Sequence, residues 1–337
     1  MSRPEYINSF VGFPSFFKTP IIDVEGIKEG MAVVAGVPID MGIVLARPGT
    51  RYGPKAIRES SNLYRGYSEV AIEKTVVNID TKVAWRLKEH PNVADIGDFT
   101  IYPQDIMETG ASITEGVYEI AKRGALPVVL GGDHYITYPS FEGFAKAMAE
   151  RKSNPRLGHV HIDSHPDFRD RYENFGRYNH GTCVRRLSEN SMVSYKNLAW
   201  VGLNGNVLDA DIYRIYRSQR LKMFSAQDVR EQGIGEIIKE AVETAADGTD
   251  AIYVSIDIDV VDGSQSPGTG APVFEGIDAR DLLRAMEQLS SYDIIGAIDL
   301  CEVAPNFDPG ERTAHLAANG LVAFLAPRLF DTVNLDS

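Results

Sequence analysis

The sequence predicts a single-domain α/β fold built around a mostly parallel β-sheet. Short runs rich in aliphatic and β-branched residues recur along the chain, and several are apolar without alternation, which is typical of strands covered on both faces. Segments with apolar residues at helical spacing lie between them, and alternating strands and helices are typical of a parallel sheet. No repeat or linker divides the 337 residues, so we expect one domain, with residues 1–30 as an N-terminal arm.

Each expected element has its own signal. The expected strands are, in chain order, 31–37, 92–97, 126–132, 157–163, 198–203, 251–259 and 294–300. The clearest expected helices are 103–124 and 234–248, which both end in Gly, and 278–291, which opens with a capping Asp.

Composition restricts the class of partner. Lys and Arg number 34 and Asp and Glu number 47, which gives a formal net charge of −13. Such a charge argues against nucleic acid or an anionic membrane and is compatible with a cationic substrate. The chain has only two cysteines, Cys183 and Cys301. Because it also shows no signal peptide and no run near the roughly 20 apolar residues of a membrane span, we expect a cytoplasmic protein.

Polar clusters follow four of the expected strands. They are Gly131–His134, Asp163–Asp167, Asp257–Asp262 and Glu302. Ligands of open α/β sheets bind beyond the carboxyl ends of the strands. We therefore expect the four clusters to converge on one site.

The spacing within these clusters indicates a metal centre. Asp257 and Asp259 are two residues apart on an extended segment, so they point the same way and repel each other unless a cation lies between them. The ionisable residues of DSHPD alternate in the same manner. The candidate ligands are His134, Asp163, His165, Asp167, Asp257 and Asp259. Mixed imidazole and carboxylate ligation suits Mn²⁺ or Ni²⁺, and six side chains fit two ions about 3.5–4 Å apart better than one.

Three blocks resemble the signature motifs of the ureohydrolase family, which contains arginase and agmatinase. They are GGDHYIT, DSHPD and SIDIDVVDGSQSPGTGAP. The resemblance extends over residues 36–325, and the RPGTRYGPKAIR and NHGT blocks resemble agmatinase more than arginase. It implies the arginase-like fold, three α/β/α layers around a parallel eight-stranded sheet.

The resemblance also implies how the ligands are divided between two ions. One ion would take His134, Asp163, Asp167 and Asp257. The other would take Asp163, His165, Asp257 and Asp259. Asp163 and Asp257 would therefore bridge the two ions, which explains how so many charged groups can be buried together.

The expected chemistry is hydrolysis of a guanidino compound to urea and an amine. Resonance makes the guanidinium carbon a poor electrophile, and a metal-bound water with a pKa near 7 supplies hydroxide at neutral pH. By the resemblance, Asp167 holds and passes on the proton, and His180 stabilises the intermediate or shuttles protons. Glu302 pairs with the guanidinium. His180 and Glu302 are thus expected to be both catalytic and substrate-binding.

The substrate is expected to be agmatine-like and cationic. Departures from the agmatinase pattern weaken that assignment: Phe274 and Glu275 in PGTGAPVFEG, Ser164 and Pro166 in DSHPD, and the insertion-like segment 76–92. We expect Glu275 to bind a cationic tail. Hydrolysis of guanidinobutyrate, of free guanidine, or of a substituted guanidine or metformin-type biguanide stays open, and some relatives of this kind use nickel.

Two other protein classes are weighed against this interpretation. A metal-dependent deacetylase on a related fold would need one zinc, and His165 and Asp259 argue against it. A noncatalytic subunit of a hetero-oligomeric ureohydrolase tends to lose ligands, whereas this set is intact. Since the family is commonly trimeric or hexameric, we expect a homo-oligomer, and assembly with a paralogous subunit stays open.

Overall fold

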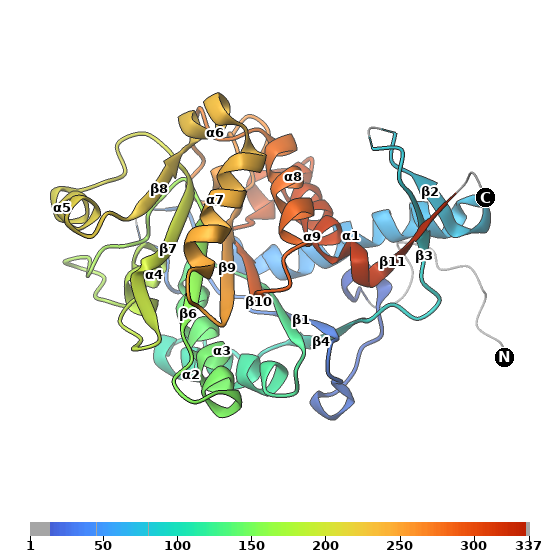
Figure 1. Cartoon of the computed structure of the whole chain (residues 1–337), viewed down its shortest axis with the longest axis horizontal. Helices are drawn as coiled ribbons and strands as arrows, with labels where there is room; N and C mark the ends of the chain where they lie inside the picture. The colour runs from blue at the N-terminus through green and yellow to red at the C-terminus, as the bar shows by residue number, and fades with distance from the viewer. Residues whose placement is uncertain (1–13, 45, 80, 335–337) are drawn as a thin grey trace.

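The computed structural model describes residues 14–44, 46–79 and 81–334, and its centre is an eight-stranded sheet (Figure 1). All neighbouring strands are parallel, in the order β4–β1–β5–β10–β9–β6–β7–β8. The strands are β1 (Ala32–Gly36), β4 (Val93–Asp98), β5 (Leu126–Leu130), β6 (Leu157–Ile162), β7 (Val193–Leu203), β8 (Lys222–Ser225), β9 (Ala251–Asp257) and β10 (Ile295–Cys301). The parallel sheet predicted from the sequence is confirmed, and the short edge strand β8 is the one that the sequence pattern did not indicate.

Helices cover both faces of this sheet. One face packs against α1 (Gly53–Val70), α6 (Ala226–Gln232), α7 (Ile234–Ala246), α8 (Ala279–Leu289) and α9 (Arg312–Leu329). The other packs against α2 (Ile106–Ala121), α3 (Thr137–Arg151), α4 (Cys183–Leu187) and α5 (Ala210–Gln219). The predicted three-layer α/β/α arrangement is therefore present, with α2 and α3 opposite α7 and α8 in Figure 1. No helix among the described residues is long and apolar enough to cross a membrane.

The central strands owe their apolar sequences to these two layers. All seven residues of β9 are buried, and so are all six of β6. A strand that is covered on both faces has no solvent side and needs no polar alternation. The two largest apolar clusters lie one on each face, and each includes side chains from alternate positions of the same strands.

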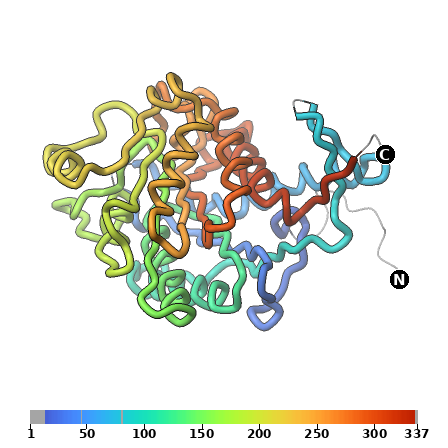
Figure 2. The backbone as a smooth tube through the Cα atoms, in the orientation of Figure 1, coloured from blue at the N-terminus to red at the C-terminus, as the bar shows by residue number. Residues whose placement is uncertain are grey.

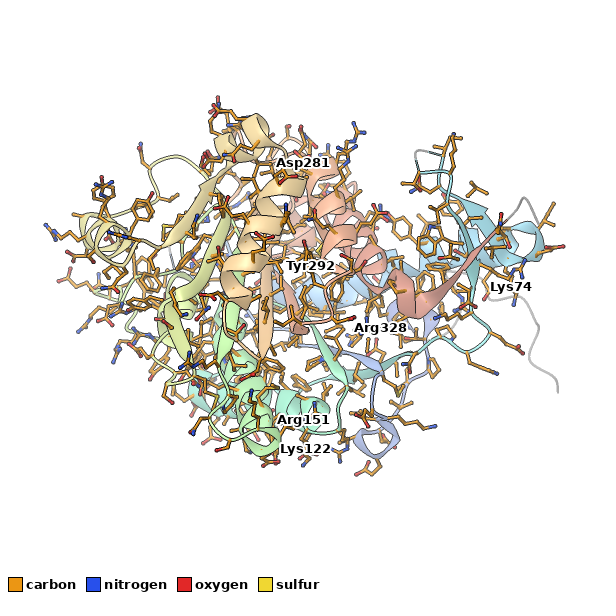
Figure 3. The ribbon with its side chains drawn as sticks, viewed as in Figure 1. Lys74, Lys122, Arg151, Asp281, Tyr292 and Arg328 are labelled. Carbon is orange, nitrogen blue, oxygen red and sulfur yellow. The ribbon has the colours of Figure 1, made fainter. Side chains whose placement is uncertain are left out.

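A second, antiparallel sheet was not predicted. It contains β2 (Thr75–Val77), β3 (Ala84–Leu87) and β11 (Phe330–Val333) in the order β11–β3–β2. Figure 2 shows the red C-terminal segment beside the cyan segment that follows α1, on a projection from the main body. Lys74 lies on this projection (Figure 3). The insertion-like segment 76–92 thus supplies two strands that pair with the C-terminal end of the described chain.

The described part of the expected N-terminal arm packs against the main body. Phe16 and Phe17 are fully buried in the same apolar cluster as Ile57 of α1. The backbone N–H of Phe16 donates to Asp95 Oδ2 at 2.8 Å, and that of Phe17 donates to Ser61 Oγ at 2.7 Å. Residues 1–13 of the expected arm lie outside the described residues.

Candidate metal centre

Four neighbouring strands at the middle of the sheet carry the candidate residues. β5, β10, β9 and β6 follow one another in the sheet, and their register pairs Leu130 with Leu300 and Ile162 with Ile256. The strands therefore end at nearly the same level. The residues at or just beyond these ends are His134 after β5, Glu302 after β10, Asp257 and Asp259 at β9, and Asp163, His165 and Asp167 after β6. The sheet thus brings together the clusters that the sequence predicted to converge.

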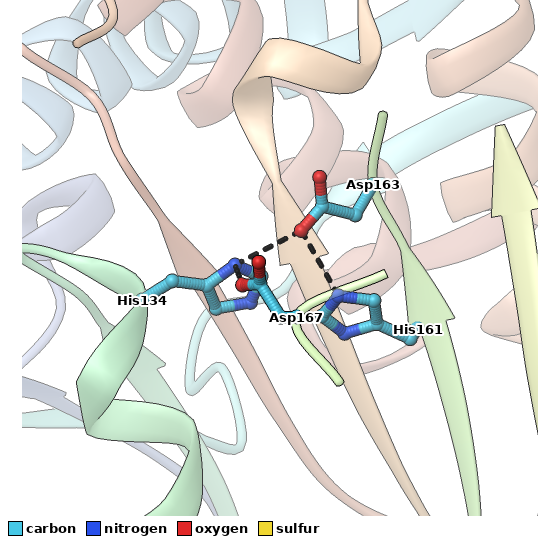
Figure 4. Close-up of side chains that lie close together, drawn as sticks. All are labelled: His134, His161, Asp163 and Asp167. Carbon is cyan, nitrogen blue, oxygen red and sulfur yellow. Dashed lines mark ion pairs between the residues drawn. The ribbon is translucent and has the colours of Figure 1, made fainter. Parts of the chain in front are cut away.

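The first group of ligand atoms surrounds the imidazole of His134. Its Nδ1 atom lies 3.2 Å from Oδ2 of each of three carboxylates, those of Asp163, Asp167 and Asp257. Figure 4 shows the side chains of His134, Asp163 and Asp167 pointing toward one another. All four residues are at least nine-tenths buried.

The second group lies on the other side of Asp163. His165 Nδ1 is 3.5 Å from Asp163 Oδ1 and 3.2 Å from Asp259 Oδ2. The two oxygens of Asp163 therefore face different groups, Oδ2 toward His134 and Oδ1 toward His165. The ring of His165 is partly exposed and lines the cavity described below.

The donor set suits divalent cations. His134 Nδ1 and Asp163 Oδ2 are buried, and neither has a hydrogen-bond partner among the described residues. Burial raises the pKa of Asp257 well above its ordinary value, and repulsion from Asp259 and Asp163 raises it further. Cations would remove that repulsion. Ligand atoms about 2.1 Å from an octahedral ion lie ~3 Å from one another. His134 Nδ1 lies at a similar distance, 3.2 Å, from each of its three carboxylate oxygens.

Buried side chains next to the candidate ligands orient them. Ser255 Oγ lies 2.7 Å from His134 Nε2 and donates to Asp299 Oδ1 at 2.7 Å. Ser164 Oγ donates to Asp259 Oδ1 at 2.7 Å. Partners of this kind fix the tautomer and direction of metal ligands. Neither Ser255 nor Asp299 was predicted from the sequence, although both lie on predicted strands.

His161 is a further residue that the sequence analysis missed. Its Nε2 atom is 2.9 Å from Asp163 Oδ2, and its ring stacks on that of His134 with centroids 4.9 Å apart (Figure 4). It lies two residues before Asp163 on β6, so the alternation in HVHID was the signal that could have revealed it.

His180 and Glu302 form a pair beside the ligands. His180 Nδ1 is 3.2 Å from Glu302 Oε1, which also accepts from the backbone N–H of His134 at 2.8 Å. The backbone N–H of Val44 donates to His180 Nε2 at 3.1 Å. Burial lowers the pKa of His180, but the carboxylate of Glu302 more than offsets this and raises the pKa to about 9. Once protonated, Nε2 becomes a donor and no longer accepts from Val44.

The glycine of the NHGT block is required by a close approach. A Cβ atom on Gly181 would lie 2.5 Å from the hydroxyl oxygen of Tyr172. Tyr172 and Gly181 both line the cavity. The absence of a side chain at Gly181 therefore lets the tyrosine ring pack against this backbone.

A cavity of about 290 Å³ opens onto the candidate metal centre. Its polar lining consists of His165, Asp167, Arg169, Tyr172, His180, Asn206, Asp257, Asp259 and Glu302. Its apolar lining includes Val44, Ala46, Pro166, Phe168, Val207 and Ala271. A space of this size accommodates a small molecule with a short aliphatic tail.

Glu275 is not brought together with the other candidates. Its side chain is exposed, and it is not among the residues that line the cavity. Its backbone N–H donates to Asp262 Oδ2 at 2.7 Å, and its carbonyl accepts from Arg230 at 2.9 Å. The neighbouring Phe274 is 84% exposed. The loop is anchored by its backbone, so the geometry gives no support to Glu275 as a substrate-binding residue.

Comparisons with known proteins identify the relatives of this chain. The family model described as the arginase family matches residues 31–326. The chain is 32% identical over 323 residues to the mitochondrial guanidino acid hydrolase of Homo sapiens, covering 96% of this chain and 84% of that protein. It is 32% identical over 321 residues to the guanidinopropionase of Pseudomonas aeruginosa, covering 95% and 92%.

A solved structure shows the same architecture. The proclavaminate amidinohydrolase of Streptomyces clavuligerus matches with a TM-score of 0.77 and 28% sequence identity, over 96% of this chain and 98% of that one. The family model covers most of the chain, and both relatives are above 30% identity. The chain belongs to the arginase family of ureohydrolases, hydrolases that act on C–N bonds in amidines.

Proposed function

We propose that this chain hydrolyses a small guanidino compound to urea and an amine at a centre of two divalent metal ions. The observation that carries the proposal is the position of Asp163, whose two oxygens face the His134 group and the His165 group. A carboxylate shared in this way suits a pair of ions better than one ion. Both relatives described above act, by their names, on guanidino compounds.

The metals and the protein would divide the chemistry between them. Two divalent cations held by these ligands would supply hydroxide at neutral pH by lowering the pKa of water. In the reaction, the oxygen of water bonds to the guanidinium carbon and the C–N bond to the amine breaks. The leaving amine needs a proton, and Asp167, which both faces His134 and lines the cavity, is placed to hold one.

Glu302 and His180 act on the substrate. Glu302 lines the cavity and offers a carboxylate to the guanidinium, which offsets the repulsion between a cationic substrate and the metals. His180 carries a proton near the same position through its Nδ1 contact with Glu302. The backbone N–H of His134 also donates to Glu302 and holds its carboxylate in one orientation.

A urea-release assay tests the proposal. The purified chain is loaded with Mn²⁺ or Ni²⁺ and supplied with agmatine, guanidinobutyrate, arginine, guanidine and metformin. Urea from at least one of these compounds supports the proposal and excludes a noncatalytic subunit. If none yields urea with either metal, the proposed function is wrong, and mixing with a paralogous subunit then tests the noncatalytic alternative.

We also propose that the chain assembles into a homo-oligomer, a trimer or hexamer by family resemblance. The projection formed by the second sheet and the end of α1 exposes several large apolar side chains: Leu63, Tyr67, Val70, Ile72, Val77 and Ile79. Such patches are typical of protein interfaces. Light scattering on the purified chain gives the mass of the assembly, and a monomer at micromolar concentration contradicts this part of the proposal.

A further inference from the structure

The cavity has an acidic floor and one strongly basic residue. The acids of the floor are three candidate metal ligands, Asp167, Asp257 and Asp259, together with Glu302. Arg169 is the single Lys or Arg among the residues that line the described cavity. Arg169 follows the DSHPD block by two residues. Its side chain is 43% exposed, which places it at the mouth of the cavity rather than among the buried ligands.

The guanidinium of Arg169 is held in place by its neighbours. Its Nε lies 3.4 Å from Asp209 Oδ2, and its Cζ lies 5.1 Å from the ring centroid of Tyr172. Its backbone N–H donates to the carbonyl of Gly181 at 3.4 Å, which ties this segment to the one that carries His180. Contacts at Nε and at the ring restrict the orientation of the planar guanidinium before a ligand arrives.

The outer edge of this guanidinium is available. Among the described residues, the guanidinium has one ion-pair partner, Asp209, and its two Nη groups make no hydrogen bond. Two parallel N–H donors of this kind match the two oxygens of a carboxylate. A guanidinium that is oriented in this way suits an anionic group with two acceptor oxygens.

Asp209 does not offer an equivalent site for a cation. Its Oδ1 accepts from the backbone N–H groups of Asp211 and Ile212 as the N-cap of α5. Its Oδ2 faces Arg169. Asp209 is also not among the residues that line the cavity. An ammonium group at the mouth would therefore meet the positive charge of Arg169 first.

We propose that Arg169 selects a guanidino acid by binding the carboxylate at the end of the substrate's tail. This inference rests on the proposed function, since it assumes that the guanidinium end lies at Glu302 and the metals. The tail would pass between apolar residues of the lining such as Phe168 and Val207. A cationic tail was expected because of Glu275, which lies outside the cavity. The positive charge of Arg169 at the mouth of the cavity favours an anionic tail instead.

Three substrates with similar tails and different charges test this role. They are 4-guanidinobutyrate with a carboxylate, butylguanidine with an uncharged end, and agmatine with an ammonium. We expect Arg169→Gln to lower kcat/KM for guanidinobutyrate about 10- to 100-fold, the effect of losing a charged hydrogen bond. The loss should appear mainly in KM. The value for butylguanidine should stay within about twofold, and that for agmatine should rise.

Two further variants separate recognition from stability. Arg169→Glu should reverse the preference between guanidinobutyrate and agmatine. Arg171→Gln, an exposed arginine in the same segment and outside the cavity lining, should change none of the three values. Metal content, measured by elemental analysis, should be equal in all variants. A parallel loss for all three substrates in Arg169→Gln would show a structural role and overturn the inference.

The failure of this inference differs from the failure of the proposed function. If the protein releases urea from agmatine and guanidinobutyrate but Arg169→Gln does not change the ratio of their kcat/KM values, the proposed function stands and carboxylate selection is rejected. If wild-type protein with both metal sites filled releases urea from none of the compounds, the proposed function is wrong and the inference falls with it.

Discussion

The Nδ1 atom of His134 lies 3.2 Å from Oδ2 of Asp163, and neither atom has a hydrogen-bond partner among the described residues. Two buried polar atoms that face each other without a hydrogen bond are costly unless a third group lies between them. A divalent cation is that group in our account. Because the other oxygen of Asp163 faces His165, the same carboxylate would join both halves of the centre.

The shared position of Asp163 predicts unequal effects of ligand loss. Asp163→Asn should remove both metals and activity, whereas Asp259→Asn should leave the His134 group partly occupied. Elemental analysis of the two purified variants after metal loading gives the ions per chain. Two full equivalents in Asp163→Asn would show that this residue does not bridge.

Glu302 should act on turnover rather than on metal binding. Glu302→Gln keeps an oxygen for the N–H of His134 but loses the charge that faces the guanidinium. A charge-assisted hydrogen bond contributes about 1.5–3 kcal/mol, or roughly one to two decades in rate. Steady-state kinetics on the best substrate, with metal content measured in parallel, checks this. Unchanged kcat/KM contradicts the role of Glu302.

The pair of His180 and Glu302 predicts a pH dependence of stability in the metal-free protein. The pKa of His180 is raised from 6.5 to about 9, so the folded state binds its proton more tightly than the unfolded state does. The stability from this pair is therefore complete below pH 6.5 and is lost as the pH rises through about 9. The difference in free energy of unfolding between wild type and His180→Gln should shrink over that window.

Chemical denaturation at pH 6 and pH 10 measures this difference, and NMR titration of the ring gives the pKa directly. Glu302→Gln should move the titration of His180 to lower pH. A pKa at or below 6.5 in wild type would mean that the N–H of Val44, which favours an unprotonated Nε2, outweighs Glu302.

Glu275 should have no influence on substrate choice. Its side chain is exposed and outside the cavity lining, so Glu275→Gln should leave the ratio of kcat/KM for agmatine and guanidinobutyrate unchanged. This variant also serves as the carboxylate-to-amide control for Glu302→Gln. A changed ratio would restore the specificity role that the sequence suggested for Glu275.

Much of the fold was predictable because burial on both faces leaves a local signal. β9 and β6 are buried throughout and mostly apolar, and their strand-end acids are close in sequence, so the pattern located both sheet and site. The pairing of β11 with β3 was not predictable in this way. It joins Phe330 to Leu87 across more than 200 residues, and short strands of mixed polarity carry no distinctive period.

Prediction of the site from the sequence was limited in the same way. His134, Asp163 and Asp257 could be grouped because each lies at or just after the end of a strand, and parallel strands end on the same edge of a sheet. The place of a loop side chain depends on backbone contacts that no residue pattern specifies. Glu275 was predicted to bind the substrate, and Arg169 was overlooked. The folded loops show that Arg169 lines the cavity and that Glu275 does not.

The dependence of urea release on bound metal tests the central claim most directly. Metal-free protein is titrated with Mn²⁺ or Ni²⁺ in the presence of its best guanidino substrate, and urea is measured at each addition. We predict that activity rises until two ions are bound per chain and then stays constant. Full activity at one ion per chain, or urea release without metal, would contradict a two-metal hydrolase.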